Sequence, residues 1–320
     1  MPDLTSGRPL YGGIELGGTK VICVAGHSDG EIVASARVPT TAPDDTMARA
    51  VERLKAFQTE HGRLEALGIA AFGPIDLRPS SPAYGCLLNT PKPQWSHARI
   101  LDRVDREFSV PVALASDVEG AALAEGLLGA AKDADPFVYL TVGTGIGAGV
   151  IAGGRPVRGL LHPEIGHIGV ARRPGDRFPG SCPFHGDCLE GMASGPAMSR
   201  RWGMPAEDLT GDLRTEALTL EAGYLADGLR SIVFSFAPRR IVVGGGVGLT
   251  PGLLPMVREA LKASLGGYPG IDEFTEPGYV RAAELGGMAG AAGALVLAGS
   301  ASTAHSSRRT NPPGGEEGER

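Results

Sequence analysis

A strand that turns on glycine and runs straight back occurs twice in this sequence, and this recurrence restricts the fold more than any other feature. The first copy joins residues 11–16 to residues 20–25 through Gly17-Gly18-Thr19, and the second joins residues 137–142 to residues 147–152 through Gly143-Thr144-Gly145. Apolar runs of this length on either side of a glycine turn predict β-hairpins. The recurrence predicts a weak internal repeat of one α/β half, and two such halves facing each other would bring both turns to one cleft.

Short apolar strands alternate with helices along the rest of the chain, which is typical of an α/β fold. In residues 46–61, for example, Met47, Val51, Leu54 and Phe57 recur at helical spacing. We also expect helices at residues 99–108, 120–131, 215–236, 251–265 and 288–297, and strands at residues 31–38, 66–72, 112–115, 155–157, 240–243 and 279–282. We expect irregular segments at residues 75–96 and 159–190, and a disordered tail at residues 300–320, where Ser, Arg, Pro, Gly and Glu dominate.

Composition and charge exclude several classes of protein. Glycine makes up 49 of the 320 residues but shows no three-residue period, which excludes a collagen. The composition, with 42% hydrophobic and 21% charged residues, excludes a disordered chain. A net charge of −6 argues against a nucleic-acid partner. Because the sequence shows no secretory signal and no apolar run of membrane length, we expect a cytoplasmic protein with no membrane partner. Four cysteines are too few for a disulfide scaffold.

The first glycine turn carries the residue types that bind phosphate. Gly17 and Gly18 let backbone N–H groups approach an anion with no Cβ in the way. Thr19 adds a hydroxyl, Lys20 a positive charge, and Glu15 a carboxylate able to hold Mg²⁺ through water. An ordinary glycine hairpin is the alternative interpretation.

Two further glycine clusters extend this pattern. The second turn, Gly143-Thr144-Gly145 with Gly147, is followed by a strand instead of the helix that a dinucleotide fold requires. A third cluster, Gly244-Gly245-Gly246, lies between a short strand and a helix. The three clusters together predict a nucleotide held from three sides, and we expect it to approach bare backbone at Gly12-Gly13 as well.

Asp117 is the candidate catalytic residue. It follows a short strand and opens a helix, within Ala115-Ser116-Asp117-Val118-Glu119. One interpretation is a simple helix N-cap, where Asp is common. The other, which the glycine turns favour, is a general base that accepts the proton of a sugar hydroxyl while the oxygen attacks the γ-phosphorus of ATP.

A cluster of cysteines and histidines predicts a metal site. Cys182, His185 and Cys188 are spaced closely enough to bind one ion, and His167 completes a Cys₂His₂ set suited to structural Zn²⁺. His162 is the competitor for the fourth position. Because four protein ligands leave no open position on zinc, we expect the metal to shape the loop over residues 162–190 and to take no part in the chemistry.

Two carboxylates flank this metal loop. Glu164 lies just before His167, and Glu190 lies just after Cys188. Carboxylates at these places can accept hydrogen bonds from vicinal sugar hydroxyls. A solvated surface glutamate is the alternative interpretation for each of them.

These motifs together resemble those of the ROK family of sugar kinases, within the actin–hexokinase–heat-shock-chaperone superfamily, and most of all its zinc-containing bacterial fructokinases. The resemblance extends over about residues 11–298 and is carried by segments 11–20, 70–77, 84–95, 116–126, 141–149, 162–170 and 182–197. The zinc segment and Thr90-Pro91-Lys92-Pro93 with Trp95 are the most specific to that branch. The resemblance implies an α/β, two-domain actin/hexokinase-like (ribonuclease H-like) fold with an interdomain cleft and a zinc-stapled loop. We expect residues 1–116 with 288–299 in a smaller domain and residues 117–287 in a larger one.

The resemblance also implies roles for the candidate residues. Asp117 matches the catalytic base of the family, while the matches to its sugar contacts are Glu164, His167 and Glu190, with Gly73 and Ser116 beside them. Residues 17–20 and 143–147 match its ATP phosphate loops, and residues 244–246 match the adenosine side. The family typically needs Mg²⁺ with ATP and commonly forms dimers, so we expect a homodimer.

We therefore predict an ATP-dependent hexose 6-kinase that converts D-fructose to fructose 6-phosphate. Glu15, Ser116 and His185 depart from many ROK glucokinases, but Glu15 and His185 recur in the fructokinase-like branch and so favour fructose. Glu119 stands where that branch often has Asn. The alternatives are a glucokinase or mannokinase of the same family and a sugar-sensing protein without turnover. No helix-turn-helix precedes the fold, which argues against a DNA-binding repressor.

Overall fold

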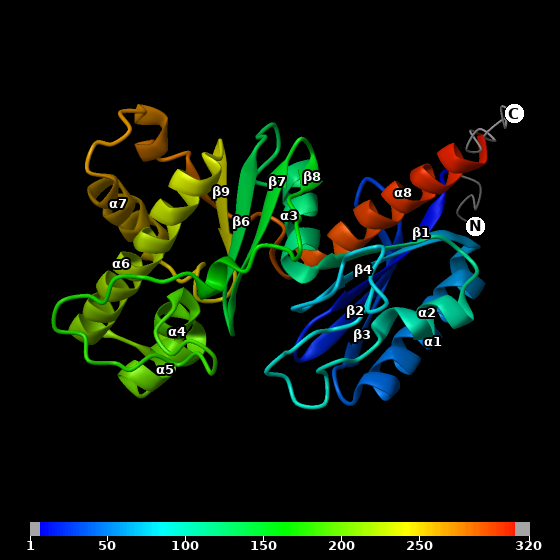
Figure 1. The fold of residues 1–320 in the computed structure, drawn as a ribbon, viewed down its shortest axis with the longest axis horizontal. Coiled ribbons are helices and arrows are strands. Elements are labelled where there is room, and N and C mark those ends of the chain that lie inside the picture. Colours follow the sequence, from blue (N-terminus) through cyan, green and yellow to red (C-terminus); the bar gives the residue numbers. More distant parts are fainter. Residues whose placement is uncertain (1–6, 311–320) are drawn as a thin grey trace, which may run out of the picture. The chain divides into compact units, whose positions relative to one another are not determined.

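The computed structural model describes residues 7–310, and contacts between residues divide the chain into two units (Figure 1). Unit 1 holds the described residues up to Gly120 and those from Gly290 onward, and unit 2 holds Ala121–Ala289. The boundaries predicted from the sequence lie at residues 117 and 288. Each unit is built on its own sheet, with helices on the sheet faces.

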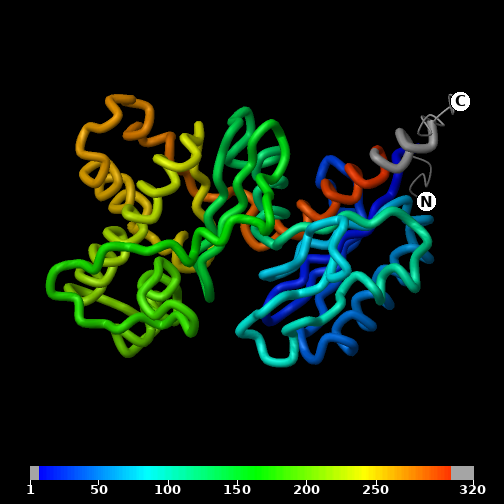
Figure 2. The backbone as a smooth tube through the Cα atoms, in the orientation of Figure 1, coloured from blue at the N-terminus to red at the C-terminus, as the bar shows by residue number. Residues whose placement is uncertain are grey.

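Unit 1 contains a five-stranded mixed sheet. Its strands are β1 (Leu10–Leu16), β2 (Lys20–Gly26), β3 (Ile32–Pro39), β4 (Leu64–Ala71) and β5 (Val112–Ser116), in the order β3-β2-β1-β4-β5. The first three strands are antiparallel to one another, whereas β4 and β5 run parallel to β1. Parallel neighbours need a crossover connection, and α1 (Pro43–His61) and α2 (Ile100–Glu107) lie in the connections that lead to β4 and β5. Residues 75–96 form a long irregular segment, as predicted from the sequence (Figure 2).

Two helices cover opposite faces of this sheet, and two glycines in β1 allow them to come close. A Cβ on Gly12 would lie 3.3 Å from Leu54 of α1, and one on Gly13 would lie 3.0 Å from Ala294 of α8 (Ala289–Thr310). Successive residues of a strand point to opposite faces, so α1 and α8 pack on opposite sides of β1. Gly12 and Gly13 are therefore packing positions, and the expectation that a nucleotide approaches them is wrong.

Unit 2 repeats the same strand order. Its strands are β6 (Phe137–Val142), β7 (Ile146–Ala152), β8 (Arg155–Pro156), β9 (Arg240–Gly244) and β10 (Val280–Ala282), in the order β10-β9-β6-β7-β8. The first hairpin is antiparallel, and β9 and β10 then add in parallel. In both units the third, second, first, fourth and fifth strands lie side by side in that order, which confirms the predicted internal repeat.

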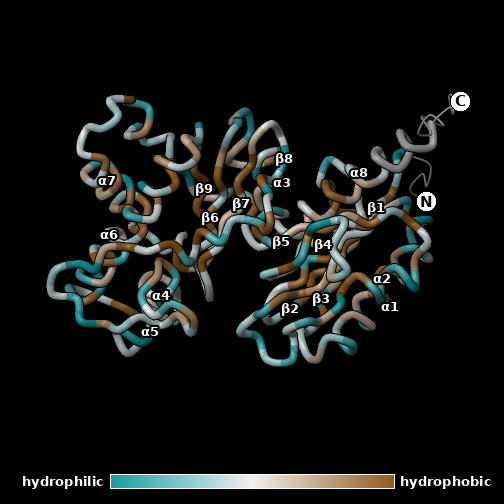
Figure 3. The backbone as a smooth tube through the Cα atoms, viewed as in Figure 1, coloured by the Kyte–Doolittle hydropathy of each residue, from teal (hydrophilic) through white to brown (hydrophobic). Residues whose placement is uncertain are grey.

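The core of unit 2 is formed by the sheet and two long helices, α6 (Gly211–Phe236) and α7 (Leu253–Leu265). Figure 3 shows hydrophobic residues concentrated along the strands of both sheets. The helix α3 (Asp117–Leu128) starts in unit 1 and continues into unit 2. Short 3₁₀ turns occur at Ile165–His167, Ala206–Asp208, Asp272–Thr275 and Gly286–Met288.

Three helical features differ from the sequence prediction. The short helices α4 (Leu189–Ala193) and α5 (Gly195–Trp202) were not predicted, because 5 and 8 residues are too few to show helical periodicity in the sequence. The helix α8 continues past residue 300 to Thr310, so the predicted disorder is wrong for residues 300–310. No Gly or Pro interrupts the chain between Gly299 and Pro312, and residues 311–320 lie outside the described part. No helix within residues 7–310 is long and apolar enough to cross a membrane.

Candidate functional site

The carboxyl ends of three parallel strands meet at one edge of the sheet in unit 1. The register pairs Leu16 at the end of β1 with Ala71 of β4, and Ala71 with Ser116 of β5. The residues that follow these strand ends include three of the predicted site elements, which are the turn at 17–19, Gly73 and Asp117. The carboxyl ends of parallel strands are the usual location of ligand sites in α/β sheets. The topology therefore gathers candidate residues that are far apart in the sequence.

Hydrogen bonds fix the backbone of the first glycine turn, and its remaining residues are exposed. Gly17 N–H donates to the Lys20 carbonyl at 3.0 Å, and the Thr40 hydroxyl donates to the Gly17 carbonyl at 2.8 Å. Thr40 N–H also donates to the Thr19 carbonyl at 3.1 Å. Gly18, Thr19 and Lys20 are exposed, and within the described chain the N–H groups of Gly18 and Thr19 donate to no protein acceptor. Free N–H groups on a fixed turn form a concavity suited to an anion.

Asp117 lies close enough to Glu15 to perturb the pKa of Glu15. Burial raises the pKa of Glu15 to about 7, with the negative charge of Asp117 adding to the effect and Lys20 opposing it. The Oε2 atom of Glu15 is buried and has no hydrogen-bond partner among the described residues. Burial also raises the pKa of Asp117, while the Val118 N–H, which donates to Oδ1 at 2.8 Å, opposes that shift. Two neighbouring carboxylates with an unused oxygen are suited to hold a proton or a hydrated cation.

The start of α3 is capped by Ser116 and Glu119, and this frees Asp117 from that task. Ser116 N–H donates to Oε2 of Glu119 at 2.8 Å, and Glu119 N–H donates to Oγ of Ser116 at 3.2 Å. Both residues are buried, with exposed fractions of 1% and 0%. These reciprocal bonds are a capping box, with Asp117 as the first residue of the helix. The interpretation of Asp117 as the N-cap is therefore wrong.

Ser116 serves the helix cap, and its hydroxyl proton is what remains to donate to a ligand. Its side chain is buried, and both its backbone N–H and its hydroxyl oxygen are engaged by Glu119. The predicted sugar contact at Ser116 therefore depends on this proton. The function of Glu119, which the sequence left without an explanation, is to complete the box.

In unit 2 the second glycine turn binds directly to Glu190. Ile146 N–H donates to Oε2 of Glu190 at 2.9 Å. A Cβ on Gly145 would lie 2.7 Å from the same oxygen, so only glycine lets the carboxylate approach this closely. Gly195 N–H, at the start of α5, donates to the Gly143 carbonyl at 2.7 Å. The structure therefore joins a predicted phosphate loop and a predicted sugar contact in one hydrogen-bonded arrangement.

The third glycine cluster lies beside the second. The register pairs Thr141 of β6 with Gly244 of β9, so both glycine segments leave the same edge of the sheet. Val247 N–H and Gly248 N–H both donate to the Val142 carbonyl at 3.0 Å. Unit 2 therefore brings the clusters at 143–147 and 244–246 together, as unit 1 does for its own turn and Asp117.

The four predicted metal ligands converge in unit 2. The ligand atoms of His167, Cys182, His185 and Cys188 all lie within 4.8 Å of one another. Sγ of Cys182 is 3.7 Å from Nδ1 of His167 and 3.7 Å from Nδ1 of His185, and Sγ of Cys188 is 3.6 Å from Nδ1 of His167. Tetrahedral zinc, with Zn–S of ~2.3 Å and Zn–N of ~2.0 Å, separates sulfur from nitrogen by about 3.6 Å. The donor set and its spacing therefore fit one zinc ion.

His162 is not part of this group. Its Nδ1 lies 3.3 Å from Oε1 of Glu164, and its side chain is only 4% exposed, whereas that of Glu164 is 37% exposed. Glu164 immediately precedes the 3₁₀ turn Ile165–His167, which directs His167 toward the two cysteines. His162 therefore contacts a predicted sugar residue and not the predicted metal.

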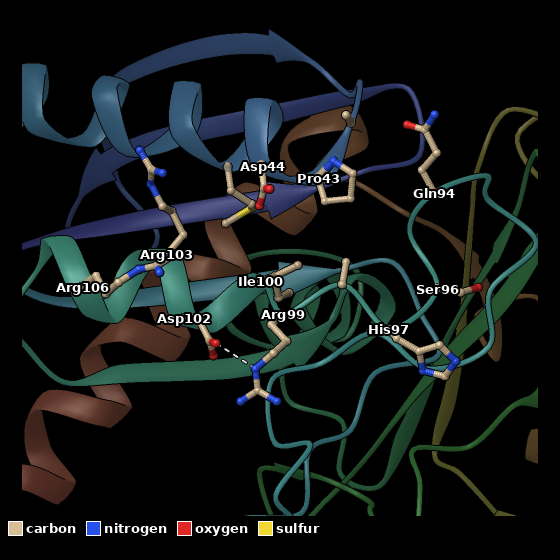
Figure 4. A pocket seen from close by; sticks show the side chains of 13 residues that line it. Pro43, Asp44, Gln94, Ser96, His97, Arg99, Ile100, Asp102, Arg103 and Arg106 are labelled. Carbon is tan, nitrogen blue, oxygen red and sulfur yellow. Dashed lines mark hydrogen bonds and ion pairs between the residues drawn. The ribbon is translucent and has the colours of Figure 1, made fainter.

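A hollow of about 500 Å³ in unit 1 contains none of the predicted site residues (Figure 4). It lies at the start of α1 and α2, with Met47 and Ile100 among its apolar residues and a rim of polar side chains. Arg99 on this rim is already paired with Asp102 at 2.7 Å. Arg103 also lies 3.8 Å from Glu107, and we assign the hollow no ligand.

Known proteins match almost the whole chain. A family model described as the ROK family matches residues 11–301. A fructokinase from Zymomonas mobilis is 40% identical over 293 residues, which cover 91% of this chain and 97% of that protein. The solved structure of a ROK hexokinase from Thermus thermophilus has a TM-score of 0.75 and 31% identity, covering 90% of this chain and 97% of that one. A ROK family glucokinase from Streptomyces griseus, in complex with glucose and AMPPNP, has a TM-score of 0.70 and 26% identity, covering 91% of this chain and 99% of that one.

Proposed function

The chain belongs to the ROK family and is a hexose kinase, and on this basis we propose that it transfers the γ-phosphoryl group of ATP to the 6-hydroxyl of D-fructose. The observation that carries the choice of fructose is the 40% identity to a fructokinase over 91% of this chain. The glucokinase solved with glucose and AMPPNP is less similar, at 26% identity. The same complex supports ATP as the donor, since AMPPNP is an ATP analogue.

Asp117 is the general base in this proposal. Ser116 and not Asp117 is the N-cap of α3, and burial raises the pKa of Asp117, which makes it a stronger base than a surface aspartate. The carboxylate accepts the proton of the 6-hydroxyl as that oxygen forms its bond to the γ-phosphorus. The bond from phosphorus to the bridging oxygen breaks, and ADP leaves with the electron pair.

The glycine turns bind the nucleotide. The free N–H groups of Gly18 and Thr19, with the hydroxyl of Thr19 and the ammonium of Lys20, bind phosphate oxygens. The turn at 143–147 has the same role in unit 2, and the segment at 244–246 beside it contacts the adenosine.

Glu164, His167 and Glu190 bind the sugar. Glu190 is fixed by the Ile146 N–H at Oε2, which leaves Oε1 to accept from a sugar hydroxyl. Glu164 is partly exposed, and its contact with the buried His162 restricts the orientation of its carboxylate. Fixed carboxylates orient the hydroxyl groups of a hexose before the reaction.

A structural zinc ion fits the ligand set of His167, Cys182, His185 and Cys188. The two cysteines are buried and the sulfur–nitrogen separations match tetrahedral zinc. The ion would fix the loop that carries Glu164 and the segment that leads into Glu190. Elemental analysis of protein purified without chelators tests this assignment, because less than about half an equivalent of zinc contradicts a structural site.

A magnesium ion fits beside Glu15. The buried Oε2 atom of Glu15 has no partner in the described part of the chain, and a hydrated Mg²⁺ would supply one. When bound with ATP, Mg²⁺ neutralises the phosphate charge. Glu15 would hold the ion at the strand end that leads into the first glycine turn.

A hexose panel tests the proposed function. ADP release is measured by a coupled assay with fructose, mannose, glucose and N-acetylmannosamine at matched concentrations. We expect the highest kcat/KM with fructose. A higher value with glucose or mannose contradicts the choice of substrate, and no turnover with any sugar contradicts the kinase function. Sugar binding in a calorimeter without ADP release would identify a sensor protein instead.

A further inference from the structure

The segment Thr90–Trp95 has no role in the proposed mechanism, although it is among the most distinctive parts of the sequence. It lies far from the first glycine turn in sequence but reaches it in the structure. The side chain of Lys92 donates a hydrogen bond from Nζ to the carbonyl of Gly18, the central residue of that turn. Both residues belong to unit 1.

This segment is anchored on both sides of Lys92. Trp95 is fully buried, packs edge-on against Phe72 with ring centroids 5.3 Å apart, and donates from Nε1 to the Thr41 carbonyl at 2.9 Å. Thr90 and Ser96 close the segment, because the Ser96 hydroxyl accepts from Thr90 N–H at 3.2 Å and donates to the Thr90 carbonyl at 3.1 Å. Lys92 therefore projects from a fixed loop.

The ammonium of Lys92 has donors to spare. A lysine ammonium has three N–H donors, and the Gly18 carbonyl uses one of them. In the described structure neither Lys92 nor Lys20 forms a salt bridge with a carboxylate, although Glu15 is near enough for Lys20 to lower its pKa. Two lysines thus accompany a turn whose N–H groups at Gly18 and Thr19 are also free.

From this arrangement we propose that Lys92 is a phosphate-binding residue, which uses its remaining donors to bind the polyphosphate chain of the nucleotide at the first glycine turn. This inference rests on the proposed function and adds a second ammonium to that turn. Two ammonium groups and a set of free N–H groups match the high negative charge and the many oxygens of a di- or triphosphate. The competing interpretation is that Lys92 only braces the Gly18 carbonyl.

Two substitutions separate these interpretations. Lys92→Met keeps most of the side-chain volume and removes the charge, whereas Lys92→Arg keeps the charge. The matched control is Lys55→Met, because Lys55 lies on the surface of α1, where it pairs with Glu107 at 2.5 Å. Binding of AMP-PNP and of AMP is measured by calorimetry for each variant, with melting temperature as the test of folding.

We expect Lys92→Met to weaken AMP-PNP binding by about 10- to 100-fold, the range for a lost hydrogen bond to a charged group. AMP binding stays near the wild-type value, since AMP lacks the outer phosphates, and Lys92→Arg restores most of the AMP-PNP affinity. Lys55→Met binds both nucleotides as the wild type does.

Two results would overturn the inference. One is wild-type AMP-PNP affinity in Lys92→Met. The other is an equal loss of AMP and AMP-PNP binding with a lower melting temperature, because a deformed turn and not a lost phosphate contact produces that pattern. Failure of the proposed function has a different signature, since the wild-type protein would then turn over no hexose whatever Lys92 does.

Discussion

Loss of the capping box at the start of α3 should lower the stability of the protein by a measurable amount. Glu119→Ala removes the acceptor of the Ser116 N–H, which is 1% exposed and has no access to water as a substitute. An unsatisfied buried donor costs about 1–3 kcal/mol. Ser116 still caps the Glu119 N–H through its hydroxyl, so part of the cap remains. We therefore expect Glu119→Ala to lower the free energy of unfolding by about 2 kcal/mol.

The effect on catalysis should be larger than the effect on stability implies. Asp117 lies between the two partners of the box, so loss of the box lets the first turn of α3 and its carboxylate move. A displacement of about 1 Å in a reacting group reduces a rate by up to about 100-fold. We expect Glu119→Ala to lower kcat about 10- to 100-fold with little change in KM for fructose. Glu119→Gln, which keeps an acceptor oxygen, should recover most of kcat.

Thr46→Val is the matched control for this prediction. Thr46 is fully buried at the start of α1, where its hydroxyl oxygen accepts from Thr41 N–H at 2.8 Å. The substitution removes the side-chain acceptor of a backbone N–H near a helix start, as Glu119→Ala does, but it does so away from Asp117. Because Thr41 is exposed and its N–H can donate to water, the loss of stability should be smaller than in Glu119→Ala. Thermal or urea unfolding and steady-state kinetics are measured for the three variants. A normal kcat in folded Glu119→Ala, or an equal loss of kcat in Thr46→Val, would refute the positioning role of the box.

Two further predictions concern Glu15 and the contact between Gly145 and Glu190. Because burial raises the pKa of Glu15 to about 7 from 4.5, the folded state binds a proton that the unfolded state has lost. The contribution of Glu15 to the free energy of unfolding should therefore fall as pH rises from 4.5 to 7. In urea unfolding without divalent cations, Glu15→Gln should remove this contribution from the pH dependence, and an unchanged pH dependence counts against the shift. Gly145→Ala places a Cβ 2.7 Å from Oε2 of Glu190, so the carboxylate must move. KM for fructose should therefore rise about tenfold. An unchanged KM would contradict a contact between Glu190 and the sugar.

The repeated hairpin was enough to predict much of the fold. Two glycine turns between apolar strands indicated two related halves, and both sheets have the same strand order. Parallel strands follow each hairpin, and their carboxyl ends collect Asp117 and the glycine turns. This part was predictable because it depends on local periodicity and on a general rule for α/β sheets.

The cluster of cysteines and histidines was predictable for a different reason. Cys182, His185 and Cys188 are so close in sequence that a short loop brings them together. The choice between His162 and His167 remained open because both lie on the same irregular segment. Only the 3₁₀ turn at Ile165–His167 and the contact between His162 and Glu164 distinguish them.

Contacts over long sequence distances were not predictable. The bond from Lys92 to Gly18 joins residues whose proximity depends on the burial of Trp95 against Phe72. The bond from Ile146 to Glu190 depends in the same way on how α4 packs. Sequence periodicity reports which face of an element is buried and gives no information on which loop reaches which turn.

Substitution of Asp117 by Asn tests directly whether this carboxylate is the general base. The substitution keeps the shape of the side chain and removes its ability to accept the proton of the 6-hydroxyl. Initial rates of ADP formation with fructose and ATP give kcat and KM, and circular dichroism checks the fold. The proposed mechanism predicts a folded protein with near-normal KM and a kcat lowered by about 100-fold or more. A kcat within about tenfold of the wild type would contradict Asp117 as the general base.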